Sequence, residues 1–376
     1  MKRCHVCGKD TLVLFPEYSR FKRVTSDTKP WPAGGHLGRC TSCGCVQALV
    51  DDAWRKEIAA IYGGYTIYFQ ADGAEQKIFE PGSGAPAARS DRLVEHIARH
   101  SSIPKQGRLL DVGCGNGNFL QSASRMLPGW TFAGVEWDEK YAAKVLAIPR
   151  VENHYTGDLG SVPGEFDAIS MIHVLEHIES PRQFLEKVKQ KLKPGGWLII
   201  ELPYYVENPF ELFVADHSSH FDCPTIESLL ASVGFQIEII ETGWVTKEIT
   251  LIARNLPGPG VKSNGTAPSV PAMIDWLGAV VKESRSIADK SPRFGLFGTA
   301  IASTWLFSEL EGRVTFFVDE DPNRIGKEIF GLPIHGPSTV PADSDVYVGL
   351  APKISQQVIR RLQSPTVRYH GVAPLP

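Results

Sequence analysis

The stretch LLDVGCGNGNFL, residues 109–120, decides the fold of the largest part of this chain. Two apolar residues lead into Asp111, and Gly113, Gly115 and Gly117 then follow at every second position. Glycine removes the Cβ where a chain turns sharply or where a ligand approaches the backbone. The pattern predicts a buried strand, a tight turn and a helix N-terminus, a junction at which ligands bind close to main-chain N–H groups.

A second apolar stretch, FAGVE at residues 132–136, ends in an acid 19 residues after Gly117. An acid at the end of the second strand of such a fold can accept hydrogen bonds from the two hydroxyls of a ribose. The glycine spacing is G-x-G-x-G, whereas dinucleotide-binding proteins have G-x-G-x-x-G. Glu136 therefore predicts a nucleoside-containing ligand, and the loop disfavours a nicotinamide dehydrogenase.

The pattern continues downstream as strands that alternate with helices. A Gly-Asp-Leu turn, residues 157–159, supplies a third acid after a short strand. Alternating buried strands and helices indicate a mostly parallel, doubly wound α/β sheet. The predicted strands are 108–112, 131–136, 166–172, 197–202 and 235–241, and the predicted helices are 90–100, 181–192 and 225–233.

These motifs, together with HVLEH at residues 173–177 and LKPGG at 192–196, resemble class I S-adenosylmethionine (SAM) methyltransferases over about residues 105–203. The resemblance implies a Rossmann-like fold whose first loop holds the amino-acid end of SAM. It also implies that the second-strand acid holds the ribose and that the third acid receives the adenine amino group. The predicted cofactor-binding residues are Asp111, Gly113, Cys114, Gly115, Gly117, Glu136, Trp137, Asp158, Leu159 and His173.

Two C-x-x-C pairs near the N-terminus predict a structural zinc site. Cys4 and Cys7 form the first pair, and Cys40 and Cys43 form the second. Four thiolates in this arrangement suit tetrahedral Zn²⁺, and such a site folds a small module that buries little core. Cys45 is a spare thiol that can compete as a ligand.

Composition bounds the remaining possibilities. The 376 residues are 43% hydrophobic and 22% charged, which predicts two or three globular domains. We find no apolar run of about 18 residues and no signal-peptide core, so we expect a cytoplasmic protein without a membrane span. The net charge is −3, but residues 1–50 hold eight Lys/Arg and three Asp/Glu, a balance of +5. This charge favours a solvated basic surface over an anionic partner.

Glycine- and proline-rich stretches, the first of them a predicted linker at residues 81–86, mark three predicted domains. They are a zinc-binding module at 1–80, a SAM-dependent domain at 86–255 and a Rossmann-like α/β domain at 268–376. The last contains FGLFGTAIA, residues 294–302, which predicts a strand, a glycine turn and a helix. This half of a nucleotide-binding fold either holds the nucleotide part of a substrate, with Gly295, Gly298 and Thr299 near phosphate, or only closes the active site.

Histidines and tyrosines supply the candidate chemistry. His173 and His177 can bind a metal only with further ligands, so we interpret His173 as lining the SAM pocket and His177 as packing or capping. Tyr62, Tyr65 and Tyr68 either line a ligand mouth or pack as linker aromatics. The predicted catalytic residues lie in VADHSSHF, residues 214–221. They are Asp216, His217 and His220, with His217 preferred as the base because it follows Asp216 directly.

The order of a four-cysteine module, a SAM domain, an acid-histidine segment and a C-terminal α/β domain resembles the zinc-containing sugar C-methyltransferases. Those enzymes act on nucleotide-linked deoxysugars, and a Tyr-x-Glu-His segment supplies their base. This chain has VADH at residues 214–217 instead. His217 therefore remains the candidate base, while carbon, nitrogen and oxygen all stay open as the methyl acceptor.

The sequence predicts a SAM-dependent methyltransferase that acts on a nucleotide-linked sugar or a related glycan or small-molecule intermediate. A nucleic-acid partner is not expected. Two alternatives remain: an RNA methyltransferase that grips phosphates with the basic zinc module, and a catalytically silent SAM-binding scaffold.

Overall fold

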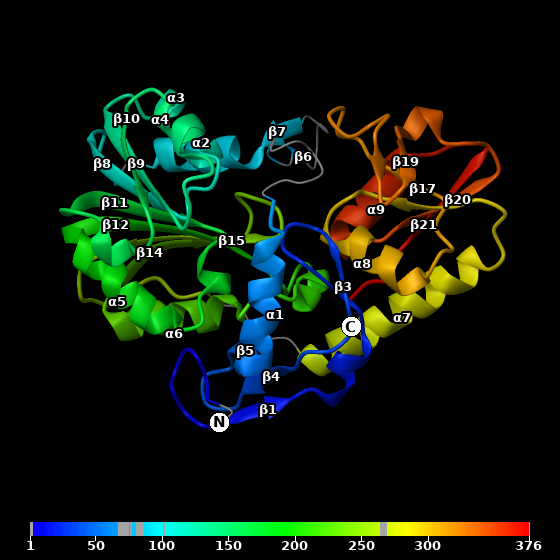
Figure 1. The fold of residues 1–376 in the computed structure, drawn as a ribbon, viewed down its shortest axis with the longest axis horizontal. Helices are drawn as coiled ribbons and strands as arrows, with labels where there is room; N and C mark the ends of the chain where they lie inside the picture. The colour runs from blue at the N-terminus through cyan, green and yellow to red at the C-terminus, as the bar shows by residue number, and fades with distance from the viewer. Residues whose placement is uncertain are drawn as a thin grey trace.

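A computed structural model describes residues 3–66, 75, 77–79, 86–100, 102–263 and 269–375. Two α/β sheets form the two sides of the molecule, and the N-terminal segment lies between and below them in Figure 1. Tyr68 and most of the predicted linker at residues 81–86 lie outside the described residues.

The central sheet has seven strands in the order β10-β9-β8-β11-β12-β15-β14. Its first five strands run parallel, and β15 is antiparallel to both of its neighbours. This is the predicted mostly parallel α/β fold. The strands are β8 (Gly107–Val112), β9 (Trp130–Glu136), β10 (Val151–Thr156), β11 (Phe166–Ile172), β12 (Leu192–Pro203), β14 (Gln236–Glu241) and β15 (Glu248–Arg254).

Helices cover both faces of this sheet. One face packs against α2 (Arg89–Arg99), α3 (Asn118–Met126) and α4 (Ala142–Leu146). The other packs against α5 (Pro181–Lys191) and α6 (Cys223–Val233), and the four predicted zinc ligands share that hydrophobic core. The short turns η3 (Leu159–Ser161) and η4 (Leu175–His177) follow β10 and β11.

The strand predicted to begin at Trp197 begins five residues earlier, at Leu192. The glycine-rich turn before Trp197 is bonded to the end of the neighbouring strand, since Gly195 N–H donates to Asn255 O and Asn255 N–H donates to Gly196 O. Gly195 has a φ of +74°, a conformation that glycine adopts without strain. The turn that was predicted to separate helix and strand therefore extends the strand.

The N-terminal segment builds a four-stranded sheet in the order β1-β4-β5-β13. Its last strand, β13 (Ser219–His220), comes from the central part of the chain and pairs antiparallel with β5. The candidate histidine segment is thereby part of the N-terminal sheet. The other elements are β1 (Leu12–Leu14), η1 (Pro16–Arg20), β2 (Arg23–Val24), β3 (Pro30–Trp31), β4 (Leu37–Cys40), β5 (Val46–Ala48), α1 (Asp52–Gly63), β6 (Lys77–Phe79) and β7 (Pro86–Ala88).

The C-terminal sheet has six strands in the order β18-β19-β17-β16-β20-β21, parallel except for β18. Helices α7, α8 and α9 pack against it (Figure 1). The elements are α7 (Val270–Ala288), β16 (Phe294–Phe297), α8 (Ile301–Leu310), β17 (Phe316–Val318), β18 (Glu328–Ile329), β19 (Leu332–His335), η6 (Pro337–Thr339), β20 (Ser344–Val348), α9 (Pro352–Arg361) and β21 (Val367–Gly371).

An aromatic core joins the three parts of the chain. Trp305 of α8 is fully buried and stacks on Phe213 of η5 (Pro209–Phe213) with ring centroids 5.0 Å apart. Phe21 lies against both rings, and the Trp305 indole N–H donates to Lys22 O at 2.9 Å. The N-terminal segment, the central part and the C-terminal sheet are thus packed into one hydrophobic cluster.

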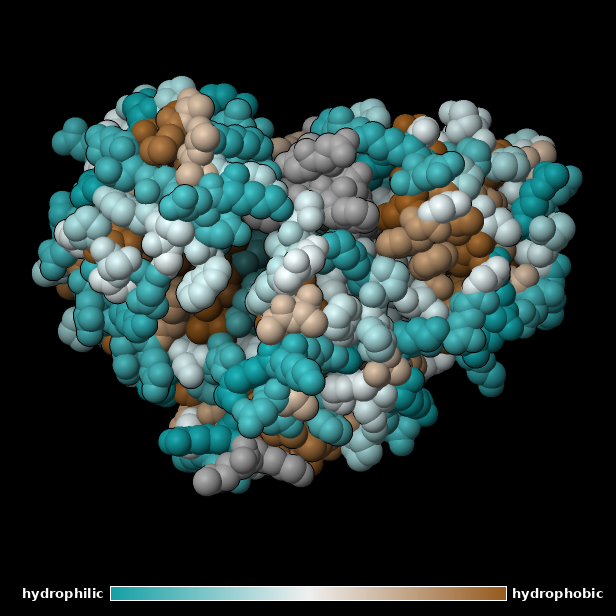
Figure 2. Space-filling model, viewed as in Figure 1, coloured by the Kyte–Doolittle hydropathy of each residue, from teal (hydrophilic) through white to brown (hydrophobic). Residues whose placement is uncertain are grey.

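None of the described helices is long and apolar enough to cross a membrane. The face shown in Figure 2 is largely hydrophilic, with hydrophobic groups scattered over it.

Trp305→Ala should lower the free energy of unfolding by about 3–5 kcal/mol, because it leaves a cavity where three parts of the chain meet. Chemical denaturation measures this loss. Trp137→Ala is the matched control, since that tryptophan is 79% exposed and its removal should change stability by less than about 0.5 kcal/mol. Equal losses of unfolding free energy in the two variants would contradict the conclusion that the aromatic core joins the three parts of the chain.

Candidate active site

A single cleft of about 1290 Å³ lies between the central sheet, the N-terminal segment and the C-terminal sheet. All three parts contribute lining residues to it. Seven predicted site residues line this cleft: Asp111, Gly113, Gly115, Glu136, Trp137, His173 and His217.

The glycine loop forms the wall of the cleft at the end of β8. Gly113, Gly115 and Gly117 have φ values of +69°, +52° and +85°, so each adopts the left-handed conformation that favours glycine. A Cβ at Gly113 would stand 2.6 Å from a Val174 methyl carbon. The loop therefore keeps its turn only with glycine at these positions.

Two acids frame the loop. The Glu136 carboxylate accepts the Gly115 N–H at 2.8 Å and the Trp137 N–H at 2.7 Å. Asp111 is buried and accepts a hydrogen bond from the Ser170 hydroxyl at 2.7 Å. Burial and the nearby Glu136 charge together raise the pKa of Asp111 to about 7, against the lowering effect of the Ser170 hydrogen bond. A cationic ligand here would favour the ionised carboxylate.

Four predicted cofactor residues do not line the cleft. The Cys114 thiol packs against Gly134, and Gly117 packs against Ile148, so both stabilise the turn from behind. Asp158 is exposed, caps η3 and pairs with Lys187 at 3.1 Å.

Leu159 is buried in the core beneath α5. Asp158 and Leu159 are thus absent from the lining of the cleft, and the contact of Asp158 with an adenine amino group stays a prediction.

The carboxyl ends of β11 and β12 carry buried charges. His173 has a φ of +55°, and its ring lies 3.3 Å from Glu176 and 3.3 Å from Glu248. Arg89 reaches Glu201 at 3.5 Å and Glu248 at 3.9 Å. The three glutamate side chains are at most 11% exposed, and those of Arg89 and His173 are half-buried.

Burial shifts these groups strongly. It raises the pKa of Glu201 to about 7, of Glu176 to about 8 and of Glu211 to about 7. It also lowers the pKa of His173 well below its ordinary value, and the Arg89 charge lowers it further. The site therefore holds several carboxyl groups that share too few cations to be fully ionised.

The three predicted catalytic residues lie in different surroundings. The Asp216 carboxylate accepts the Ser26 N–H at 2.8 Å and lies 3.6 Å from His177, so it does not orient His217 as expected. His217 does line the cleft, and burial together with the neighbouring His177 lowers its pKa well below the ordinary value. His220 lies in β13 against the N-terminal sheet and not at the cleft.

His177 reaches the cleft instead of only packing or capping. Its Nδ1 lies 3.1 Å from Asp216 O and 3.2 Å from the Tyr62 hydroxyl. Tyr62 and Tyr65 both line the cleft, which favours the interpretation of these tyrosines as part of a ligand mouth.

The opposite wall of the cleft comes from the C-terminal sheet. Gly298, with a φ of +86°, and Thr299 line it at the start of α8, whose N-cap residue Ala300 provides no side-chain cap. Arg324 donates to the Thr299 hydroxyl at 2.9 Å. Gly295 lies inside β16 against the Phe316 ring and not at the cleft, so the prediction that it lies near phosphate lacks support here.

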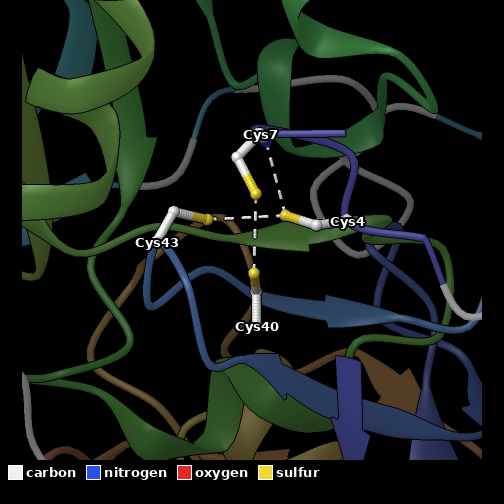
Figure 3. A group of neighbouring side chains, drawn as sticks. All are labelled: Cys4, Cys7, Cys40 and Cys43. Carbon is white, nitrogen blue, oxygen red and sulfur yellow. Dashed lines mark hydrogen bonds between the residues drawn. The ribbon is translucent and has the colours of Figure 1, made fainter. Parts of the chain in front are cut away.

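The four cysteines converge at the edge of the N-terminal sheet, with their sulfur atoms pointing toward one another (Figure 3). Cys4 Sγ lies 3.4 Å from Cys43 Sγ, and Cys7 Sγ lies 3.6 Å from Cys40 Sγ. Sulfur atoms of a tetrahedral zinc site with Zn–S bonds of about 2.3 Å are about 3.8 Å apart. The donor set therefore fits Zn²⁺ by kind, number and spacing.

Cys45 is not one of the four converging thiols. Its Sγ lies 3.6 Å from the Val46 carbonyl, and a hydrogen bond with the Cys4 thiol, together with burial, raises its pKa well above the ordinary value.

Sequence comparison agrees with this geometry. Residues 87–239 match the family model of the methyltransferase domain. This part of the chain is a class I SAM-dependent methyltransferase domain. The glycine loop, Glu136 and Asp111 all lie within it, whereas the four cysteines and the C-terminal sheet lie outside.

Curated relatives match the same region. The chain is 32% identical over 114 residues to a ubiquinone biosynthesis O-methyltransferase of Chromobacterium violaceum, covering 28% of this chain and 47% of the relative. It is 33% identical over 121 residues to the mitochondrial ubiquinone biosynthesis O-methyltransferase of Schizosaccharomyces pombe, covering 30% and 44%. The chain thus spans less than half the length of these two relatives.

Among solved structures, a SAM-dependent methyltransferase from Mesorhizobium loti is 19% identical, with a TM-score of 0.36. The similarity covers 44% of this chain and 97% of that one.

The residues that sequence reasoning missed are the charged groups around His173. These groups come from four separate elements, and only the folded chain brings them together. They are Arg89 of α2, Glu201 of β12, Glu211 of η5 and Glu248 of β15. A sequence signal existed for Glu201 alone, because an acid inside the apolar run of a buried strand is unusual.

Replacing one cysteine should abolish the thiolate site. We expect cobalt-substituted protein to show intense thiolate-to-cobalt charge-transfer absorption, and Cys43→Ser to lose most of it. Cys223→Ser is the control, because that buried thiol is not one of the four. Unchanged absorption in Cys43→Ser would exclude the four-cysteine site.

Glu201→Gln should stabilise the protein more at pH 8 than at pH 5. The pKa of Glu201 is about 7 in the folded state, whereas its ordinary value is 4.5. Between pH 4.5 and 7 the folded state therefore binds more protons than the unfolded state, and the stability of the wild type falls as the pH rises through this range. Glutamine has no proton to lose, and the gain in unfolding free energy should reach at most about 3 kcal/mol. Denaturation at both pH values measures it. The exposed Glu152→Gln should show no such difference, and a gain independent of pH would contradict the assignment.

Proposed function

We propose that the protein transfers the methyl group of SAM to a polar small molecule, a nucleotide-linked sugar or a related glycan intermediate. The observation that carries the proposal is the shared cleft. Its one wall is the SAM-binding loop of the methyltransferase domain, and its other wall is the uncapped start of α8. Free N–H groups at such a helix start favour phosphate.

The reaction needs mainly positioning. The bond between the methyl carbon and sulfur breaks as the acceptor atom bonds to that carbon, and the electron pair stays on sulfur. We propose that Asp111 and Glu136 hold SAM by its charged end and its ribose, and that the acceptor group lies against His217, the predicted base. The matched relatives are named O-methyltransferases, which supports an oxygen acceptor.

The charge of the C-terminal wall favours a polar substrate over an apolar quinone. Arg324, Arg360 and Arg361 line it together with Asp319 and Asp321. Arg360 is exposed on α9, and no ion pair or hydrogen bond of its guanidinium is seen among the described residues. A phosphate bound at the start of α8 could therefore gain this cation as a partner without displacing an internal ion pair.

The basic N-terminal segment supports the RNA alternative only weakly. Arg23 is buried in an ion pair with Glu57, and Lys22 pairs with Glu311. Two of the charges that make this segment basic thus hold the fold together. An RNA methyltransferase would also leave the C-terminal wall of the cleft without a role.

Isothermal titration calorimetry with S-adenosylhomocysteine, followed by a panel of nucleoside-diphosphate sugars, tests the proposal. We expect S-adenosylhomocysteine to bind the free protein. We also expect at least one nucleoside-diphosphate sugar to bind the protein once it is loaded with S-adenosylhomocysteine. Glu136→Gln should weaken the cofactor about tenfold or more, and Arg360→Gln should weaken the sugar nucleotide about two- to tenfold.

Arg99→Gln is the matched control for charge, because its side chain is 74% exposed on α2. Cofactor binding without any sugar nucleotide, combined with salt-sensitive binding of short RNA, would replace the sugar proposal by the RNA alternative. Cofactor binding without turnover of any substrate would favour the scaffold.

A further inference from the structure

Three side chains that can bind a metal ion meet inside the cleft, two from η4 after β11 and one from the segment before β13. They are Glu176, His177 and His217. One carboxylate oxygen and one nitrogen of each imidazole all lie within 4.8 Å of one another. The cluster is separate from the four cysteines, and it offers nitrogen and oxygen instead of sulfur.

The backbone holds the three side chains in place. Ser218 N–H donates to Glu176 O at 2.8 Å, and the Ser218 hydroxyl donates to the same carbonyl at 3.0 Å. The rings of His177 and His217 meet edge to face with centroids 4.7 Å apart. Because η4 is bonded to the histidine segment, the donor atoms are positioned before any ligand arrives.

His177 has the partner that orients a metal-binding histidine. Its Nδ1 faces the Asp216 carbonyl oxygen at 3.1 Å, and a carbonyl can only accept a hydrogen bond. The Tyr62 hydroxyl, which can also accept a hydrogen bond, lies 3.2 Å from the same Nδ1. We therefore assign the proton of His177 to Nδ1 and the metal-binding lone pair to Nε2. Ligating histidines in metal sites characteristically donate their other N–H to a carbonyl or a carboxylate in this way.

Glu176 supplies an independent sign of a missing cation. Its side chain is 2% exposed, and neither carboxylate oxygen makes a hydrogen bond within the described residues. Its nearest basic neighbour is the His173 ring, whose Nδ1 lies 3.3 Å from Oε1 without bonding geometry. A buried carboxylate without a partner costs free energy that a bound cation would offset.

We propose that Glu176, His177 and His217 bind a divalent transition-metal ion, and that this ion holds the acceptor oxygen of the substrate. Two imidazoles and one carboxylate suit Zn²⁺, Mn²⁺ or Fe²⁺, and three protein ligands leave coordination positions open toward the cleft. The inference rests on the proposed function. It adds that His217 acts on the acceptor through the ion, which lowers the pKa of a bound hydroxyl.

Manganese titration of protein that holds one Zn²⁺ per chain, at the four cysteines, tests the site by electron paramagnetic resonance of free Mn²⁺. Mn²⁺ prefers oxygen and nitrogen ligands, so the thiolate site will not compete for it. We expect one Mn²⁺ per chain for wild type. Glu176→Gln and His217→Gln should each weaken binding by about tenfold or more, because each removes one of three ligands.

His220→Gln is the matched control, because this buried histidine lies in β13 outside the cluster and should leave Mn²⁺ affinity unchanged. Cobalt–thiolate absorption of every variant reports that the N-terminal module is folded. An absence of Mn²⁺ binding, or equal affinity in wild type, Glu176→Gln and His217→Gln, would overturn the metal site.

S-adenosylhomocysteine binding, measured on the same samples, separates the two proposals. If the cofactor binds and Mn²⁺ does not, the metal site is wrong and the proposed function stands. If the cofactor does not bind, the proposed function is wrong, whatever the manganese result.

Discussion

The structure depends on how residues 213–220 are held. Phe213 stacks on Trp305 of the C-terminal part, Asp216 accepts hydrogen bonds from Ser26, and Ser218 is bonded to the turn after β11. Ser219 and His220 then complete the N-terminal sheet. One short segment therefore joins all three parts of the chain, and the cleft forms where they meet. His217 lies in the middle of it, so its position is fixed from three sides.

The cleft concentrates negative charge where little water can reach it. Glu176, Glu201 and Glu248 are buried near one another, with the half-buried Glu211 beside them, and Arg89 is the main cation among them. Such a cluster is destabilising unless protons or cations neutralise it. SAM brings a sulfonium and an ammonium to this edge, and a divalent ion would bring two further charges. The buried carboxyl groups thus favour the binding of cationic ligands in the cleft.

The sequence predicted the central sheet and the glycine loop because local patterns determine both. The strand at 166–172 has the same limits in sequence and structure, and Asp111 and Glu136 both reach the cleft. Local sequence patterns could not predict the contacts of Asp158 and His220. Asp158 pairs with Lys187, and His220 is drawn into a strand whose partner, β5, precedes it by more than 170 residues. Long-range strand pairing decided the place of His220, and the contact of Asp158 with the cofactor stays a prediction.

The four converging cysteines and the cleft are mechanically linked through that same pairing. Gln47 of β5 is fully buried, binds the backbone of His5 and Arg3 beside the cysteines, and lies opposite Ser219 in the sheet. Arg182 of α5 adds a bond to Val6 O on the other side. A metal ion at the cysteines would stiffen β5, and β5 in turn fixes the segment that carries His217. A structural metal can therefore set the geometry of the acceptor edge without touching a substrate.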